Sequence, residues 1–217
     1  NDVVKIFMAD DTIEKFMGSQ ALESSQNTLY HKAYVELKGI QVASEFEDVL
    51  FINKPAGVLS QRAEGNNLSA NEWLIGYLLS KNVITDEDLK TFKPSICNRL
   101  DRNTSGLLVC SKTLLGSQEM AGILKDRRLH KFYRCMVRGT CELEGVYEAY
   151  LYKDEKNNKV TVYNDFEQVP VGLQDKVKAI KTGIKPIQHC KDYTELEIEL
   201  FTGKTHQIRA QMEKLGF

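Results

Sequence analysis

The sequence lacks the features that would mark a metal protein, a disulfide-stabilised protein or a membrane protein. Its five cysteines are scattered and odd in number, and neither a Cys-x-x-Cys nor a His-x-x-x-His pair occurs in the 217 residues. We therefore expect no zinc site or disulfide framework, but free thiols in a reducing cytoplasm. No apolar run reaches the ~18 residues that mark a membrane span, and the first residues lack the basic start and apolar core of a signal peptide. These absences predict a cytoplasmic protein with no membrane segment and no bound metal.

Neither sign of charge is in excess over the whole chain. The formal net charge of −1 argues against a protein that coats nucleic acid indiscriminately. The charges are nevertheless unevenly placed, because nine Lys or Arg residues stand against three acids in residues 95–138, whereas residues 142–199 are net acidic. The basic stretch predicts a phosphate-binding groove, and the acidic stretch is predicted to face away from nucleic acid.

The composition, 42% hydrophobic and 27% charged, is that of an ordinary globular protein. Hydrophobic periodicity predicts helices over residues 70–80 and 114–125 and a last helix with Ile208, Met212 and Leu215 on one face. It also predicts strands over residues 49–53, 107–111, 133–137, 146–152, 160–163, 179–187 and 195–200. The fold class is therefore α+β, a largely antiparallel mixed β-sheet flanked by helices.

Two of the predicted helices carry more detailed signals. Ser69 and Glu72 have the spacing of a capping box at the start of the first helix, and Trp73 is interpreted as a core anchor rather than a base-stacking platform. In the helix over residues 114–125, the side chains expected to face inward are Leu114, Leu115, Ala121 and Leu124. Gly216 is predicted to end the last helix.

The most informative stretch is Arg99-Leu100-Asp101, followed at once by Thr104-Ser105-Gly106. Taken alone, an aspartate before Thr-Ser-Gly is most often a turn residue. Three further segments change that interpretation, namely Asn53-Lys54-Pro55-Ala56-Gly57, Lys131-Phe132-Tyr133 with Gly139 downstream, and the run from Phe201 to Arg209. In this order and spacing the four segments resemble the motifs of the RluA-type pseudouridine synthases, which isomerise uridine within RNA. The resemblance extends from about Asp48 to the end of the chain.

The resemblance implies a role for individual residues. Asp101 matches the catalytic aspartate, which either attacks the sugar C1′ or assists departure of the base, and both possibilities stay open. Tyr133 matches the tyrosine that packs against the target uracil, and Arg209 matches the arginine that pairs with the aspartate. The residues expected to contact RNA are Arg99, Arg102, Lys54 and Lys204. The reaction has no redox or group-transfer step, so no cofactor is expected. RNA is the expected partner and a monomer the expected state.

Each of these residues also has a purely structural interpretation. A tyrosine on a strand is usually a core residue, an arginine beside the apolar stripe of a short helix is usually solvated, and we interpret His206 as a capping or backbone-bonding residue. One position departs from the resemblance, because Asn98 stands where the family usually has histidine. Asparagine can hydrogen-bond but cannot titrate near neutral pH, so its tolerance depends on whether this position orients the loop or transfers a proton.

The expected organisation has three parts. Residues 1–18 are interpreted either as the remnant of a small N-terminal RNA-binding module or as a loose arm, and residues 19–44 as a polar linker. Residues 45–217 are expected to form the pseudouridine synthase catalytic domain, incomplete at its C-terminus because the related enzymes continue further.

Three classes of function remain. The first is a uridine isomerase acting on ribosomal large-subunit RNA, with transfer RNA as the alternative substrate. The second is a non-catalytic RNA-binding or ribosome-assembly protein on the same fold. The third, a carboxylate glycosidase, is disfavoured because it needs a second acid beside Asp101 and no motif supplies one.

Overall fold

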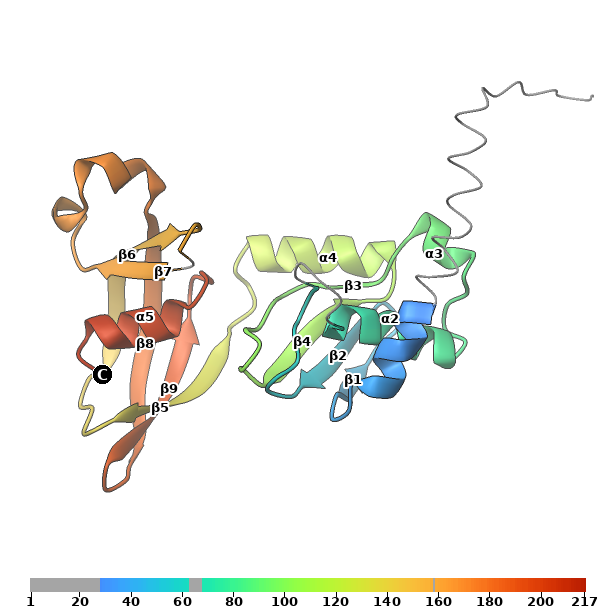
Figure 1. Ribbon diagram of the computed structural model, residues 1–217, viewed down its shortest axis with the longest axis horizontal. Helices are drawn as coiled ribbons and strands as arrows, with labels where there is room; N and C mark the ends of the chain where they lie inside the picture. The colour runs from blue at the N-terminus through green and yellow to red at the C-terminus, as the bar shows by residue number, and fades with distance from the viewer. Residues whose placement is uncertain (1–27, 63–67, 158) are drawn as a thin grey trace, which may run out of the picture. The chain divides into compact units, whose positions relative to one another are not determined.

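The computed structural model describes residues 28–62, 68–157 and 159–217, and the chain divides into two compact units, residues 1–122 and 123–217. Each unit has its own antiparallel sheet and its own helices (Figure 1). The α+β class is confirmed. No helix in the described part of the chain is long and apolar enough to cross a membrane.

The first unit is built on a four-stranded antiparallel sheet in the order β1-β2-β4-β3. Its elements are β1 (Gln41–Glu45), β2 (Val49–Lys54), α2 (Ala70–Ser80), α3 (Asp88–Thr91), β3 (Ser95–Ile96), β4 (Gly106–Ser111) and α4 (Leu114–Lys125), the last of which crosses into the second unit. Alternate residues of β2, Leu50 and Ile52, are fully buried. Because β4 pairs with both β2 and β3, the loop before β4 leads into an inner strand of the sheet.

The predicted start of α2 is confirmed, although the cap differs in detail. The Ser69 hydroxyl accepts the Asn71 N–H at 3.3 Å and donates to the Glu72 carboxylate, so the two capping side chains bond to each other. Trp73 is 5% exposed, and its ring stacks on that of Tyr77 with centroids 5.4 Å apart. Its interpretation as a core anchor is therefore confirmed.

The inward face predicted for α4 is wrong. Leu114 and Leu115 are more than half exposed, Ala121 is exposed and Leu124 only partly buried, and the buried residues are Gly116 and Met120. A Cβ atom at Gly116 would lie 2.3 Å from the Asp48 carbonyl oxygen. The backbone of the helix therefore packs closely against Asp48 at Gly116. Such a contact leaves no apolar stripe in the sequence.

The predicted linker is also partly folded. Residues 28–36 form a helix in which Tyr30 and Ala33 are buried, and Tyr30 packs with Ile75 and Leu89. This helix lies close against α2, because a Cβ at Gly76 would meet the Tyr30 carbonyl at 2.2 Å. Only Tyr30 and Ala33 of this segment are buried, so its polar sequence shows no apolar stripe that would predict a helix. The module remnant or loose arm predicted for residues 1–18 lies outside the described residues.

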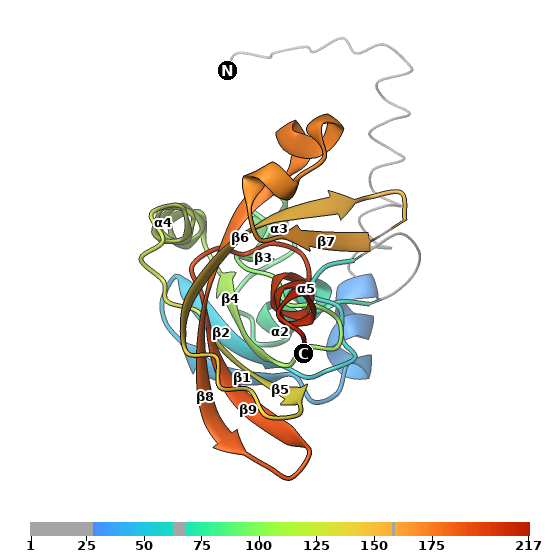
Figure 2. The ribbon, with the colours of Figure 1, turned by 90° about the vertical axis from the view of Figure 1, so that its left-hand side faces the viewer.

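The second unit is built on a five-stranded antiparallel sheet in the order β5-β9-β8-β6-β7. Its elements are β5 (Phe132–Arg138), β6 (Gly145–Asp154), β7 (Lys159–Tyr163), η1 (Phe166–Gln168), η2 (Val171–Lys176), β8 (Lys178–His189), β9 (Tyr193–Leu200) and α5 (Gln207–Lys214). The predicted alternation in β9 is confirmed, since Leu196, Ile198 and Leu200 are buried. The β6–β7 hairpin lies beside α5 (Figure 2).

Helix α5 packs its apolar face on this sheet. Met212 is buried with Leu196 and Ile198, which confirms the face predicted for the last helix. Its end is closed by Gly216, at φ +99°, with the Gly216 N–H bonded to the Glu213 carbonyl at 3.1 Å and the Phe217 N–H bonded to the Met212 carbonyl at 3.0 Å. These two bonds form a Schellman motif, so the predicted glycine cap is confirmed.

Candidate active site

Asp101 lies in the loop that leads from β3 into β4. It is half-buried, and its carbonyl accepts the Thr104 N–H at 3.0 Å, which closes a turn. Gly106, at φ +132°, lets the chain leave that turn and enter β4. The neighbouring Arg99 and Arg102 side chains are exposed. The loop therefore carries a half-buried carboxylate that is flanked in sequence by two exposed arginines.

A second loop, residues 55–60 after β2, braces the backbone of the Asp101 loop. The Ser60 hydroxyl donates to the Leu100 carbonyl at 2.7 Å and accepts the Leu100 N–H at 3.0 Å. The Gly57 N–H donates to the Arg102 carbonyl at 2.8 Å, and Arg102 Nε donates to the Gly57 carbonyl at 3.1 Å. The residues on both sides of Asp101 are thus fixed by bonds to one loop.

Lys54 belongs to the same brace and is not a surface residue. It is fully buried, and its Nζ donates to the carbonyls of Pro55, Val58 and Arg102 at 3.0, 2.8 and 3.2 Å. Burial lowers the pKa of Lys54, and the negative charge of Asp101 partly opposes that shift. In this position the Lys54 ammonium supports the Asp101 loop, and the RNA contact expected at Lys54 stays a prediction.

Asn98 orients the loop from its other end. Its Oδ1 accepts the Val109 N–H at 2.7 Å, and its Nδ2 donates to the Leu107 carbonyl at 3.3 Å. Both halves of the side-chain amide are therefore bonded to the β4 backbone. This arrangement favours the interpretation that the position orients the loop, a task for which asparagine suffices.

In the second unit, Tyr133 lies on β5 opposite Ile198 of β9. It is partly buried and packs against the core cluster that contains Val137 and Ile198. The core interpretation of this strand tyrosine is consistent with that contact, whereas its packing against a uracil stays a prediction.

Arg209 is exposed on α5, and the start of that helix is anchored by a buried glutamine. Gln207 is 2% exposed, and its Oε1 accepts the Thr202 hydroxyl at 3.0 Å and the Lys204 N–H at 3.1 Å. Its Nε2 donates to the Thr182 hydroxyl at 2.9 Å. The loop before α5 is therefore held to β8 by side-chain amide bonds.

The same network continues one helical turn further. Gln211 is also 2% exposed; its Oε1 accepts the Thr182 hydroxyl, and its Nε2 donates to the Tyr147 carbonyl at 3.3 Å. The sequence analysis missed both glutamines, although two amides at i and i+4 on a helix that packs on a sheet are a detectable signal. His206 stands at the N-cap position in the left-handed region, at φ +56°, and its side chain makes no capping bond. Of the two roles predicted for His206, side-chain capping is therefore wrong, and bonding to the backbone stays a prediction.

The predicted site residues are divided between the two units. Asp101, Arg99 and Arg102 belong to the first, and their loop also contains Asn98, whereas the second unit holds Tyr133, Arg209 and Lys204. The ion pair between Asp101 and Arg209 therefore stays a prediction.

The basic stretch of residues 95–138 is only partly available for phosphate. Lys112 bonds to Glu45 at 2.9 Å and to the Phe46 carbonyl at 2.8 Å, and Arg134 pairs with Glu195 at 3.2 Å. Arg99 and Arg102 remain the exposed cations nearest Asp101 in sequence. Among the described residues, no cluster of three or more His, Cys, Asp or Glu side chains could hold a metal ion.

The model of the RNA pseudouridylate synthase family matches residues 48–214. The matched residues include the braced aspartate loop, β5 and α5. This chain belongs to that family. It is 29% identical over 182 residues to the ribosomal large subunit pseudouridine synthase D of Borreliella burgdorferi, covering 82% of this chain and 52% of the relative. It is 33% identical over 182 residues to an uncharacterized RNA pseudouridine synthase of Mycoplasma pneumoniae, with the same coverage.

Solved structures agree on the fold. Human RNA pseudouridylate synthase domain containing 4 superimposes with a TM-score of 0.63 at 16% identity, covering 88% of this chain and 68% of the human one. This likeness concerns the fold alone. The chain spans about half the length of the curated relatives it matches.

Proposed function

We propose that this protein isomerises uridine to pseudouridine in RNA, with Asp101 as its catalytic residue. The observation that carries the proposal is the braced loop: the backbone on both sides of Asp101 is fixed by Ser60, Gly57 and Lys54, and Arg99 and Arg102 stand exposed beside it. A carboxylate held rigidly and flanked in sequence by cations is suited to act at the C1′ of a nucleotide whose phosphates those cations neutralise.

The reaction breaks the N1–C1′ bond of uridine, turns the base and joins its C5 to C1′. The C5 proton leaves to solvent and N1 gains a proton, so no oxidant and no second substrate is consumed. The uracil must first leave its stack, because none of the reacting atoms is accessible within one. In this proposal Tyr133 packs against the flipped base, Arg209 pairs with Asp101, and Arg99, Arg102 and Lys204 contact RNA.

Ribosomal large-subunit RNA is the substrate we propose. Its support comes from relatives in Borreliella burgdorferi, Neisseria meningitidis and Zymomonas mobilis, each of which is named ribosomal large subunit pseudouridine synthase D. Transfer RNA is the alternative substrate, and a monomer acting without cofactor or metal completes the proposal.

The test is tritium release from RNA labelled at uracil C5, with Asp101→Ala and Asn103→Ala compared with the parent protein. Asn103 is exposed in the same loop and serves as the matched control. Release by the parent and by Asn103→Ala, but not by Asp101→Ala, supports the proposal. Tight RNA binding without release from either large-subunit or transfer RNA would instead identify a binding protein.

A further inference from the structure

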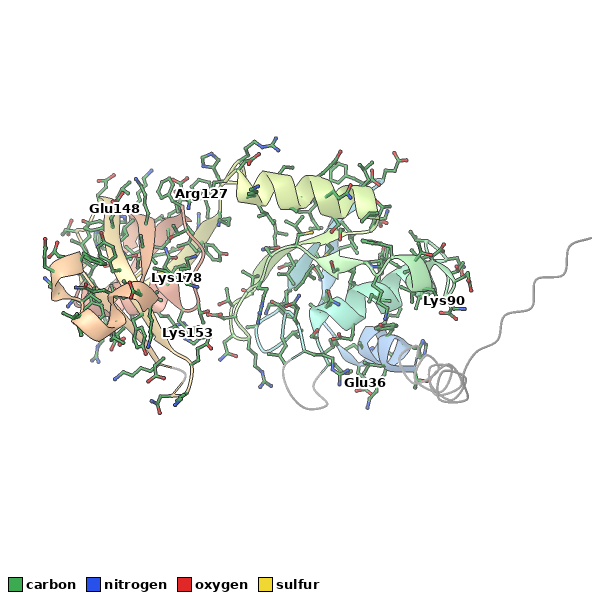
Figure 3. The ribbon with its side chains drawn as sticks, turned by 90° about the horizontal axis from the view of Figure 1, so that it is seen from above. Glu36, Lys90, Arg127, Glu148, Lys153 and Lys178 are labelled. Atoms are coloured by element: carbon green, nitrogen blue, oxygen red, sulfur yellow. The ribbon has the colours of Figure 1, made fainter. Side chains whose placement is uncertain are left out.

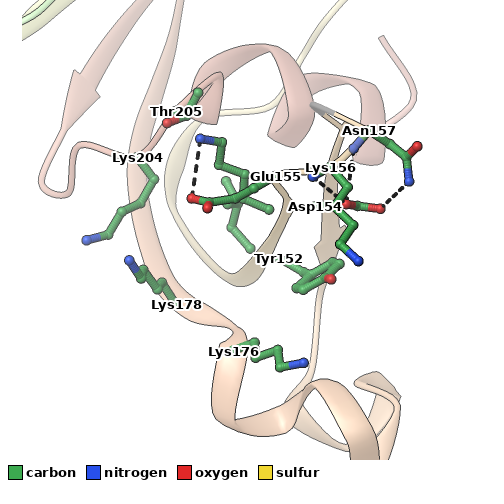
Figure 4. Close-up of a pocket in the computed structure, with 11 residues that line it drawn as sticks. Tyr152, Asp154, Glu155, Lys156, Asn157, Lys176, Lys178, Lys204 and Thr205 are labelled. Atoms are coloured by element: carbon green, nitrogen blue, oxygen red, sulfur yellow. Dashed lines mark hydrogen bonds and ion pairs between the residues drawn. The ribbon is translucent and has the colours of Figure 1, made fainter.

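The second unit has a hollow lined by lysines that the catalytic motifs do not include, apart from Lys204. Its volume is about 690 Å³, and its walls are the β6–β7 hairpin, the end of η2 with the start of β8, and the loop before α5 (Figure 4). The cations that line it are Lys153, Lys156, Lys176, Lys178 and Lys204. Lys153 and Lys178 are both labelled at the surface of this unit in Figure 3.

The acids of the hollow do not neutralise it. Glu155 pairs with Lys153 at 3.7 Å. The Asp154 carboxylate accepts the backbone N–H groups of Lys156 and Asn157 at 3.0 and 3.2 Å, and the side chain of Asn157 at 2.7 Å. These bonds lower the pKa of Asp154 and hold it within the hairpin turn. The hollow therefore has five lysines against two carboxylates.

The four lysines other than Lys153 make no ion pair with any acid in the described part of the chain. Lys176 and Lys178 are exposed, and the side chains of Lys178 and Lys204 end at the same side of the hollow (Figure 4). This local excess is hidden in the sequence, because residues 142–199 contain twelve acids and only eight lysines and are acidic on average.

We propose that this lysine hollow of the second unit binds the phosphodiester backbone of the RNA substrate. The proposal rests on the proposed function for the identity of the polyanion. Lysine ammonium groups act as mobile point charges, which suits successive phosphates of a flexible chain better than one fixed anion. A wide, open hollow with several unpaired cations along its walls matches that ligand. The part of residues 142–199 that forms it thus faces RNA rather than away from it.

The test compares the double variant Lys176→Gln/Lys178→Gln with the control Lys185→Gln/Lys191→Gln. All four lysines are exposed in the second unit, and the control removes the same charge outside the hollow. Binding of a fluorescently labelled large-subunit RNA fragment is measured by anisotropy over a range of potassium chloride concentrations. Circular dichroism verifies that each variant is folded.

If each of the two lysines neutralises one phosphate, the slope of log affinity against log salt falls by ~1.4 to ~1.8 in the hollow variant, and RNA affinity at ~0.1 M salt falls roughly 25- to 60-fold. The control keeps the parental slope and the parental RNA affinity. Equal losses in the two variants, or no loss in the hollow variant, would overturn the proposal.

This design separates failure of the hollow from failure of the proposed function. If the parent releases tritium and Lys176→Gln/Lys178→Gln binds RNA as tightly as the parent does, only the proposal for the hollow is refuted. A parent that binds RNA through these lysines but never releases tritium refutes the isomerase and leaves the RNA-binding hollow standing.

Discussion

Replacing Ser60 with alanine tests whether the brace, rather than the Asp101 loop itself, sets the position of the carboxylate. The Ser60 hydroxyl is the hydrogen-bond partner of both the N–H and the carbonyl of Leu100, at 3.0 and 2.7 Å, and both residues are buried. The alanine variant leaves these two backbone groups without that partner. Each unsatisfied buried group costs ~1 to 3 kcal/mol, so for the two groups we expect a loss of about 2–6 kcal/mol in the free energy of unfolding.

The single tryptophan makes this loss measurable in the unit where it occurs. Trp73 is buried in the first unit, so its fluorescence in a urea titration reports unfolding of that unit and not of the second. Ser44→Ala is the matched control, because the Ser44 hydroxyl is exposed and bonds only to the neighbouring Ala43 carbonyl at 2.8 Å. We expect the free energy of unfolding of Ser44→Ala to stay within ~0.5 kcal/mol of that of the parent.

The effect on activity follows from geometry. With Leu100 released, Asp101 samples positions away from its substrate, so we expect kcat for tritium release to fall at least tenfold while RNA affinity changes little, since Arg99 and Arg102 are retained. A Ser60→Ala variant with parental stability and parental kcat would refute the argument that Ser60 holds the loop. A loss of stability with parental kcat would show that the brace stabilises the unit without positioning Asp101.

Three further predictions concern other parts of the chain. Gly116→Ala should destabilise the first unit by ~1 to 3 kcal/mol in the same urea titration, because its Cβ meets the Asp48 carbonyl at 2.3 Å, whereas Gly122→Ala in the same helix should be neutral or stabilising. The pKa of Lys54 in the folded chain lies below its ordinary value of 10.5. Just below pH 10.5 the unfolded chain therefore binds more protons than the folded chain does. The unfolding free energy of the parent, relative to Lys54→Met, should therefore rise with pH in that window, and a flat difference would contradict a buried charged lysine. Arg209→Ala should leave circular dichroism unchanged and abolish tritium release; a near-parental rate would exclude the proposed ion pair.

The sequence predicted the regular elements well because their patterns are local. The alternation of Leu196, Ile198 and Leu200 and the cap at Ser69 each depend on a few neighbouring residues, and the structure confirms both. The failures concern contacts between distant segments. The inward face of α4 is set by Gly116 against Asp48, and the helix over residues 28–36 is set by its contact with Gly76, so neither appears as a local hydrophobic pattern.

Charge was the least predictable property of the candidate site. Lys54 was expected at the surface because lysines usually are, yet it is buried where three carbonyls accept its protons. Conversely, Lys176 and Lys178 lie in a region whose average charge is negative, and only the fold brings them together with the hairpin lysines. Average charge along a sequence does not describe charge on a surface, because strand order decides which residues become neighbours.

The two candidate catalytic segments share a physical design that their motifs do not reveal. In the first unit a buried serine binds the backbone beside Asp101, and in the second a buried glutamine binds the loop that leads to Arg209. In both cases one buried polar side chain bonds to backbone groups of the loop, so a single residue fixes the segment. Substitutions at Ser60 and Gln207 should therefore impair the reaction as strongly as many substitutions that face the RNA, although neither side chain is exposed to a substrate.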